Sequence, residues 1–249
     1  MIKRTKTASL VTIILAGSFL SVSAADTILD DFEVNEGRFT GDANSSGSST
    51  GMNKAASTFT HDTSVFFAGT ASQMIFIDDD PAVDGLANVY AWRLRHLSGG
   101  GTIANNVSLV NNAGAYVGYY LRTTTPNLLA SLILDDFDAA VNTHERGEYK
   151  PVTADGEWHL YEWNLGNAND WAGFAGTGVN GAINNATVSL DSIYVSMADD
   201  PADRDATFWI DNIAYNASGN LSPVPEPATI SLGLLGGLAA AVWLNRKRG

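Results

Sequence analysis

The sequence contains no cysteine among its 249 residues. This absence excludes disulfide bonds, thiolate metal sites and a cysteine nucleophile. Small exported domains often depend on disulfides for stability, so a disulfide-free domain must rely on other interactions. We therefore expect this protein to be held together by hydrophobic packing, with or without help from a bound metal ion.

Basic residues are scarce in the central part of the chain. Only eight of the 14 Lys and Arg residues lie between residues 26 and 220, a segment that holds 26 of the 27 acidic residues. The formal net charge of this segment is therefore near −18. A surface of this sign repels phosphate backbones, so we expect no nucleic-acid partner.

Motifs that indicate catalysis are also missing. The four histidines lack the spacing of zinc-binding motifs, and no GxSxG nucleophile motif is present. A glycosidase needs only two carboxylates. With 26 acidic residues in the segment, however, a pair can be drawn anywhere and has no specificity. We therefore expect the protein not to be an enzyme, and a glycan-cleaving enzyme is the least favoured alternative.

Residues 1–25 have the three-part pattern of a secretory signal peptide. Basic residues near the start precede an apolar run over residues 8–20, and small residues follow. The run is short for a membrane span, and Ala24 or Ala25 is a suitable last residue before cleavage. We expect this segment to be removed during export, with an uncleaved membrane anchor as the alternative.

Residues 221–249 form a second addressing segment. The segment combines a Pro-Glu-Pro spacer, an apolar stretch and a basic end: Pro225, Glu226 and Pro227, then residues 228–244, then Arg246, Lys247 and Arg248. Seventeen apolar residues are near the lower limit for a helix that crosses the hydrocarbon core. We expect a single hydrophobic helix with its basic end on the cytoplasmic side.

This order of spacer, short span and basic end resembles the PEP-CTERM sorting signal of Gram-negative bacteria. In that family an exosortase-type membrane protease recognises the tail and removes it. The resemblance implies an exported protein that is held transiently in the inner membrane and then reaches the cell envelope or the outside of the cell. A permanent single-pass anchor is the alternative.

Between these ends the pattern predicts β-strands. Segments rich in β-branched and aromatic residues, several with period-two alternation, are separated by loops rich in Gly, Asn, Ser and Asp. The predicted strands cover residues 26–34, 72–77, 88–96, 115–123, 128–134, 157–165, 187–197 and 206–215. No segment has the pattern of a capped amphipathic helix. Residues 26–220 therefore predict an all-β domain, an antiparallel β-sandwich of jelly-roll-like type.

Alternation within two of these strands predicts an exposed face with basic and aromatic side chains. In residues 88–96, Tyr90, Trp92 and Leu94 point one way, and the arginines between them point the other way. If this strand and residues 115–123 share a sheet, one solvent face carries Arg93, Arg95, Tyr116, Tyr120 and Arg122. Aromatic rings and arginine forks are suitable partners for sugars.

This face has a plainer alternative, in which the arginines pair across strands with Asp135 or Glu162. The tryptophans Trp158, Trp163 and Trp171 are expected in the core or at its rim. We expect Trp171, which lies within the predicted loop of residues 166–176, to be the most exposed of the three.

Short motifs at the start, end and late part of the domain suggest a family. They are LDDFE (29–33), FWIDNI (208–213), GEWHLYEWNL (156–165) and VSLDSIYV (188–195). These motifs resemble the non-catalytic carbohydrate-binding modules with a galactose-binding-like jelly roll. The resemblance implies a polysaccharide partner, such as an exopolysaccharide. A structural or adhesive matrix protein without a defined ligand is the alternative.

The same resemblance implies a structural Ca²⁺ that ties the first strand to the last. In this sequence its ligands fall on Glu33 and Asp211, together with Asp31. Ligation by oxygen alone is suited to Ca²⁺. Alternatively, these acids are solvated strand ends or turn formers.

Overall fold

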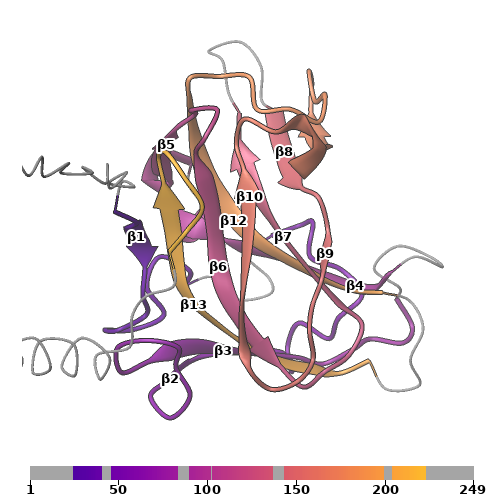
Figure 1. The fold of residues 1–249 in the computed structure, drawn as a ribbon. Helices are drawn as coiled ribbons and strands as arrows, with labels where there is room; N and C mark the ends of the chain where they lie inside the picture. The colour runs from indigo at the N-terminus through magenta and orange to yellow at the C-terminus, as the bar shows by residue number, and fades with distance from the viewer. Residues whose placement is uncertain are drawn as a thin grey trace, which may run out of the picture.

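The computed structural model describes residues 25–40, 46–83, 90–101, 103–136, 143–198 and 204–222. In these ranges the chain forms β-strands and three short 3-10 helices (Figure 1). No helix in the described residues is long and apolar enough to cross a membrane. Residues 1–24 of the predicted signal peptide and the predicted C-terminal helix lie outside these ranges.

The strands of one sheet, here sheet A, run in the order β10-β6-β13-β3-β2, with β1 paired to β13. Their bounds are β1 Thr27–Asp30, β2 Thr58–Asp62, β3 Ser72–Ile77, β6 Tyr116–Thr123, β10 Trp158–Asn164 and β13 Ala206–Asn216. All of the pairings in this sheet are antiparallel. The first and last strands of the domain are therefore direct neighbours.

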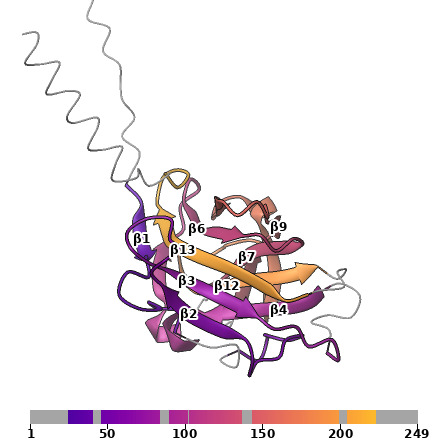
Figure 2. The ribbon, with the colours of Figure 1, turned by 90° about the horizontal axis from the view of Figure 1, so that it is seen from below.

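The other sheet, sheet B, runs in the order β11-β8-β7-β12-β4, with β5 paired to β12 and β9 to β7. The strands of sheet B are β4 Tyr90–Leu97, β5 Val107–Val110, β7 Leu128–Asp135, β8 Thr143–Gly147, β9 Lys150–Pro151, β11 Trp171–Gly176 and β12 Thr187–Ala198. These pairings are also antiparallel. The predicted antiparallel β-sandwich is confirmed (Figure 2).

Alternate residues of both sheets form one core between the layers. Trp92 and Leu94 of β4 contribute from sheet B, and Val117, Tyr119 and Leu121 of β6 contribute from sheet A; all five are fully buried. Burying one large apolar side chain contributes about 1.5–3 kcal/mol. The Tyr119 hydroxyl also donates to the Ser131 carbonyl oxygen of β7 at 2.8 Å, which links the two sheets.

Eight strands lie where the pattern predicted them, but β2, β5, β8, β9 and β11 were not predicted. The missed strands are short or polar, and β11 has the weakly strand-forming sequence WAGFAG. The expectation that Trp171 lies in a loop and is the most exposed of the three tryptophans is wrong, because Trp158 is half-buried and Trp171 is buried. Trp171 begins β11, is 4% exposed, and donates from its indole nitrogen to the Asn164 carbonyl oxygen at 2.8 Å.

Two β-bulges, one in β12 and one in β4, change which side chains face outward from sheet B. In β12 the extra residue is Asp191, between Leu190 and Ser192. In β4 the extra residue is Ala91, because Met197 pairs with Trp92 and Ala198 pairs with Tyr90. An extra residue on one strand locally breaks the alternation of side chains. These bulges help to set the composition of the outer face of sheet B, because each shifts the alternation by one residue.

Candidate functional site

The predicted five-residue surface does not exist as one face. Arg93 and Arg95 lie on β4 of sheet B, whereas Tyr116, Tyr120 and Arg122 lie on β6 of sheet A. The prediction required β4 and β6 to share a sheet. Instead, β4 pairs with β12 in sheet B, and β6 pairs with β10 and β13 in sheet A. The two halves of the set therefore lie on different sheets of the sandwich.

On sheet A, much of the predicted surface is already covered by this chain. The ring of Phe67, from the β2–β3 connection, stacks on Tyr120 with centroids 3.7 Å apart, and Tyr120 is only 7% exposed. The guanidinium of Arg122 lies over the Trp209 ring at 5.8 Å. Tyr120 and Arg122 thus already have aromatic partners within this domain.

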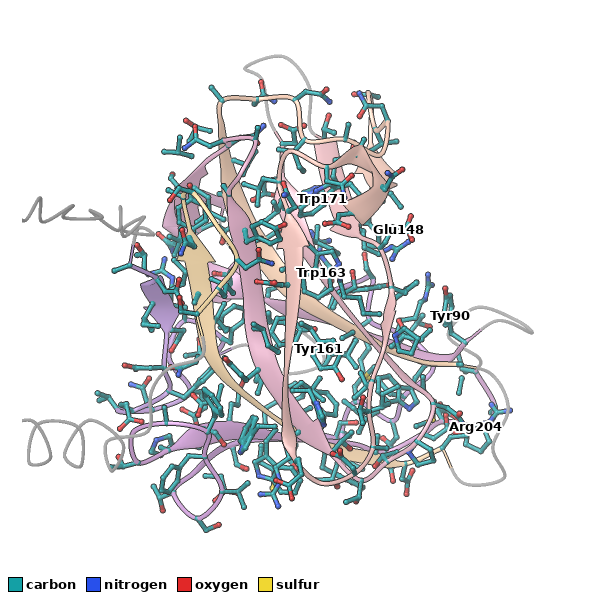
Figure 3. All side chains as sticks on the ribbon, viewed as in Figure 1. Tyr90, Glu148, Tyr161, Trp163, Trp171 and Arg204 are labelled. Carbon is teal, nitrogen blue, oxygen red and sulfur yellow. The ribbon has the colours of Figure 1, made fainter. Side chains whose placement is uncertain are left out.

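A row of four aromatic rings crosses the outer side of sheet B. Tyr90 of β4 lies 5.4 Å from Tyr149, and Tyr149 stacks on Tyr194 of β12 at 6.2 Å. Phe174 of β11 meets Tyr194 edge-on at 5.3 Å. Tyr194 is buried, while Tyr90, Tyr149 and Phe174 are half-buried. Tyr90, labelled in Figure 3, lies near the start of β4.

Tyr90 corrects a second prediction. Alternation placed it on the same side as Trp92, but its ring contacts Tyr149, whose hydroxyl lies 3.2 Å from Ser196 Oγ. A bulge at Ala91 of β4 lets Ala198 pair with Tyr90 directly after Met197 pairs with Trp92. The bulge breaks the alternation, so Tyr90 joins the aromatic row instead of the core.

Three guanidinium groups lie along this row. Arg146 of β8 lies over the Tyr149 ring at 3.9 Å, and Arg95 lies over Phe174 at 5.5 Å. Burial raises the pKa of Tyr90 and of Tyr194, and the nearby charges of Arg93 and Arg146 oppose this rise. The aromatic row with Arg93, Arg95 and Arg146 is called the aromatic face below.

The tyrosine hydroxyls of the aromatic face are neutral at physiological pH. Burial raises the pKa of Tyr90 to about 12 and also raises the pKa of Tyr149 and Tyr194, despite the nearby arginines. Neutral phenols act both as donors and as acceptors of hydrogen bonds. The face therefore offers ring surfaces, neutral hydroxyls and cationic forks together.

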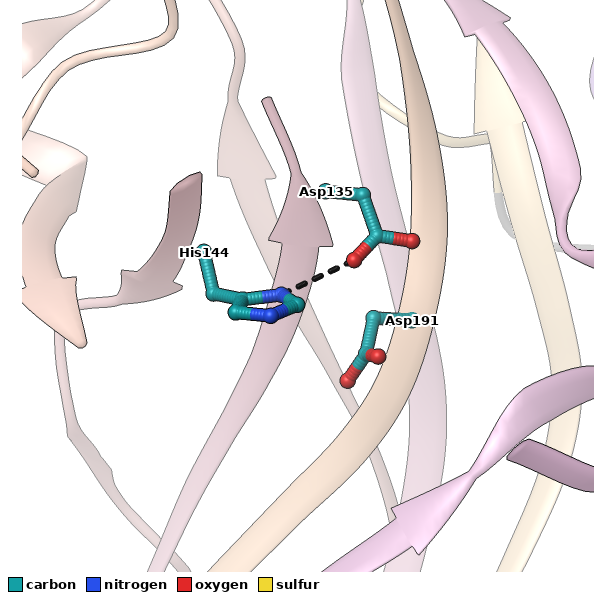
Figure 4. Close-up of side chains that lie close together, drawn as sticks. All are labelled: Asp135, His144 and Asp191. Atoms are coloured by element: carbon teal, nitrogen blue, oxygen red, sulfur yellow. Dashed lines mark ion pairs between the residues drawn. The ribbon is translucent and has the colours of Figure 1, made fainter. Parts of the chain in front are cut away.

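Beside this face, Asp135, His144 and Asp191 form a compact polar cluster (Figure 4). Their nearest ligand atoms all lie within 4.8 Å of one another. Asp135 Oδ1 lies 2.9 Å from His144 Nδ1, and Asp191 accepts from Arg95 at 2.9 and 2.8 Å. The cluster brings together residues from β7, β8 and β12.

This cluster is chemically able to hold a metal ion, because two carboxylates and one imidazole are common metal ligands. The arginine fork competes for that role, since both oxygens of Asp191 already accept from Arg95. Burial raises the pKa of Asp191, and the charge of Arg95 opposes this shift. In this arrangement Arg95 compensates the charge of Asp191.

The sequence contained only part of the signal for this cluster. Asp135 and His144 are cross-strand partners between β7 and β8, but that pairing connects an expected strand to one that was missed. Asp191 is the extra residue of the β12 bulge. The sequence could not reveal this bulge, because a bulge depends on the register with the partner strand.

The predicted calcium ligands Glu33 and Asp211 both bind the connection between β2 and β3. Glu33 accepts from the backbone nitrogens of Thr70 at 2.8 Å and Ala71 at 3.2 Å. Asp211 accepts from the backbone nitrogens of Phe67 at 2.8 Å and Ala68 at 3.3 Å. The start and the end of the domain thus meet on one loop, as the calcium prediction required.

The third predicted ligand behaves differently. Asp31 is exposed and accepts from the backbone nitrogen of Glu33 at 3.3 Å, which is typical of a turn. Asp211 is fully buried, and burial raises its pKa to about 7 although three backbone N–H groups oppose the shift. A buried carboxylate beside Glu33 gains from a compensating cation. Calcium at this position stays a prediction.

Residues 223–248 match the PEP-CTERM protein-sorting motif. The match covers the predicted spacer, apolar stretch and basic end, so the prediction of a PEP-CTERM tail is confirmed. This motif marks an exported protein. No curated protein matches the chain in sequence comparison.

Several solved structures resemble the described fold. A family 30 carbohydrate-binding module is 12% identical, with 80% of this chain and 91% of that chain covered and a TM-score of 0.42. The family 11 module of a cellulosomal cellulase from Clostridium thermocellum is 16% identical, with coverages of 80% and 98% and a TM-score of 0.44. A xylan-binding domain from Paenibacillus barcinonensis is 9% identical, with coverages of 79% and 97% and a TM-score of 0.35.

Proposed function

We propose that this exported protein binds polysaccharide, without cleaving it, through the aromatic face of sheet B. The observation that carries the proposal is the continuous row from Tyr90 through Tyr149 and Tyr194 to Phe174, with centroid distances of 5.3–6.2 Å. A row of rings suits an extended chain of sugar units, because each ring provides an apolar surface for C–H groups.

The polar groups of the face suit sugar hydroxyls. Sugar hydroxyls both donate and accept hydrogen bonds, and so do neutral tyrosine hydroxyls. The arginine forks add fixed donors. Rings that supply surface and polar groups that set orientation are typical of ligand sites.

The sorting tail supplies the cellular context for this proposal. An exported protein processed by an exosortase-type protease meets the polysaccharides of the envelope and the extracellular matrix. Residues 1–25 would direct export, and the tail would hold the protein in the inner membrane until processing. The polysaccharide-binding domain would then act outside the cytoplasm.

A Ca²⁺ ion between Glu33 and Asp211 is a second part of the proposal. Its support is that these carboxylates, from the two ends of the domain, meet on the β2–β3 connection. Oxygen ligands suit Ca²⁺. The ion would offset their charges and hold the first and last strands to that loop, with no catalytic role.

Affinity electrophoresis of the full chain tests the proposal, in a detergent that has no sugar head group. Gels containing soluble polysaccharides should retard the protein. Tyr149→Ala should weaken the retardation by about tenfold or more, because it interrupts the row. Phe174→Ala, at the end of the row opposite Tyr90, is a second variant in case Tyr149→Ala folds poorly.

Tyr116→Ala is the matched control, because it removes a tyrosine from the opposite sheet. It should bind like the unchanged protein. No new reducing ends should form during incubation, since binding is proposed without cleavage. The proposal fails if no polysaccharide retards the protein, or if Tyr116→Ala and Tyr149→Ala weaken binding equally.

A further inference from the structure

The positive charges of the aromatic face are not all compensated by carboxylates. Arg95 is paired with Asp191, and Asp135 is paired with His144. Among the described residues, neither Arg93 nor Arg146 forms an ion pair. Two cationic groups therefore remain available beside the aromatic row.

Arg146 is held in place by neutral groups. Its Nη1 donates to the Gly147 carbonyl oxygen at 2.8 Å, and its guanidinium rests on the Tyr149 ring. A guanidinium has five N–H donors, so most of its donors are left for another partner. The contact with Tyr149 holds the guanidinium of Arg146 at the aromatic row.

Arg93 carries a second indication of a missing partner. Its Nε is buried and has no hydrogen-bond partner among the described residues. Buried donors in folded proteins are nearly always paired, with protein, water or ligand. The backbone of Arg93 is fixed by mutual hydrogen bonds with Thr50 at 2.9 and 3.0 Å, so the side chain starts from a rigid position.

The placement of these arginines is notable because cations are rare in the domain. Three of the eight Lys and Arg residues between 26 and 220 lie on this face, in a segment with a net charge near −18. The tyrosine hydroxyls add no negative charge at neutral pH, because burial raises their pKa. A local excess of positive charge on an acidic domain favours an anionic ligand.

We infer that the ligand of the aromatic face is an acidic polysaccharide, whose carboxylate or sulfate groups are bound by Arg93 and Arg146 while its sugar rings stack on the tyrosines. This inference rests on the proposed function and specifies the class of polysaccharide. Arginine forks bind planar carboxylates through two parallel hydrogen bonds. Uronic acids and sulfated sugars are the two sources of such groups.

The test compares each charged polymer with its neutral counterpart, using the full chain in the same sugar-free detergent. One pair is polygalacturonate and its carboxyl-reduced form, and the other is dextran sulfate and dextran. We expect at least one charged polymer to bind roughly tenfold more tightly than its neutral partner. Raising NaCl from about 0.05 to about 0.5 M should reduce this preference. The polymer pair that shows this preference identifies whether the face binds carboxylate or sulfate groups.

Arg93→Gln and Arg146→Gln should each reduce the preference for the charged polymer, because each weakens binding of the charged polymer more than binding of the neutral one. Arg122→Gln is the matched control on sheet A and should keep the preference. Equal binding of charged and neutral polymers, or a preference that Arg93→Gln and Arg146→Gln both leave intact, overturns the inference while the proposed function stands. Failure of every polymer to bind overturns both.

Discussion

His96 shows how one buried side chain links stability to pH. It is fully buried on β4, its Nε2 lies 2.9 Å from Gln73 Oε1, and its ring packs against Phe39 and Phe59. Burial lowers its pKa from 6.5 to about 3. The fold therefore holds this imidazole neutral in a position that links β4 of sheet B to β3 of sheet A.

The lowered pKa predicts acid sensitivity. Between about pH 6.5 and 3 the unfolded chain binds a proton at His96 that the folded chain does not, so stability falls as the pH is lowered through this window. The contribution of His96 to the slope of the unfolding free energy against pH approaches about 1.4 kcal/mol per pH unit. Chemical denaturation at pH 7, 6, 5 and 4 measures it.

His96→Gln keeps a donor for Gln73 but has no titratable group. Its stability should fall less steeply over the same pH range than that of the unchanged protein. Other groups titrate in both proteins, so the difference between the two slopes isolates His96. Identical slopes would contradict the assignment.

At the scale of elements, the β2–β3 connection is the piece that joins the two ends of the domain. Glu33 follows β1 and Asp211 lies within β13, and both hold backbone N–H groups of this loop. Gly69 lies at the centre of the contact with a φ of +71°. A Cβ atom at this position would overlap the carboxylate of Glu33.

Gly69→Ala should therefore lower the free energy of unfolding by about 2–4 kcal/mol, from backbone strain and lost hydrogen bonds. Thermal unfolding of the full chain measures the change. If the loop carries the proposed Ca²⁺, a chelator lowers the Tm of the unchanged protein more than that of the variant.

Gly47→Ala is the control for this substitution. Gly47 has no atom within 4 Å of an added Cβ, and its φ is not in the left-handed region. The Tm of this variant should stay within a degree or two of the unchanged protein. An equal loss in both variants would mean that the loop contact contributes nothing specific.

At the scale of the whole molecule, the two ends of the described domain are fastened together. Asp26 accepts from Asn216 Nδ2 and from the backbone nitrogen of Ser222, both at 2.8 Å. Glu162 accepts from the backbone nitrogen of Leu221 at 2.8 Å. The residue that follows the predicted signal peptide thus contacts the last residue before the sorting motif, which starts at 223.

Mass spectrometry of the protein recovered from cells and medium tests the processing at both ends. The mature chain should begin at residue 25 or 26 and lack the hydrophobic tail. Glu226→Ala should keep the tail and accumulate in the membrane fraction, because it alters the Pro-Glu-Pro spacer. Recovery of the unchanged protein with its tail intact would instead identify a permanent anchor.

The sequence alone determined the features that depend on local order along the chain. The PEP-CTERM tail is a linear signal, and the β class follows from composition and alternation, so both were predictable. Alternation also placed Trp92 and Leu94 in the core and Arg93 and Arg95 outside. These assignments needed no knowledge of strand partners.

The tertiary structure decided what depends on pairing between distant segments. It put β4 and β6 in different sheets, which divided the predicted sugar-binding set. A bulge in β12 placed Asp191 beside Arg95. A bulge in β4 turned Tyr90 toward the aromatic face, although alternation had placed it on the side of Trp92. Strand order and register follow from packing of the whole sandwich, because each strand gains its partners only when distant segments meet.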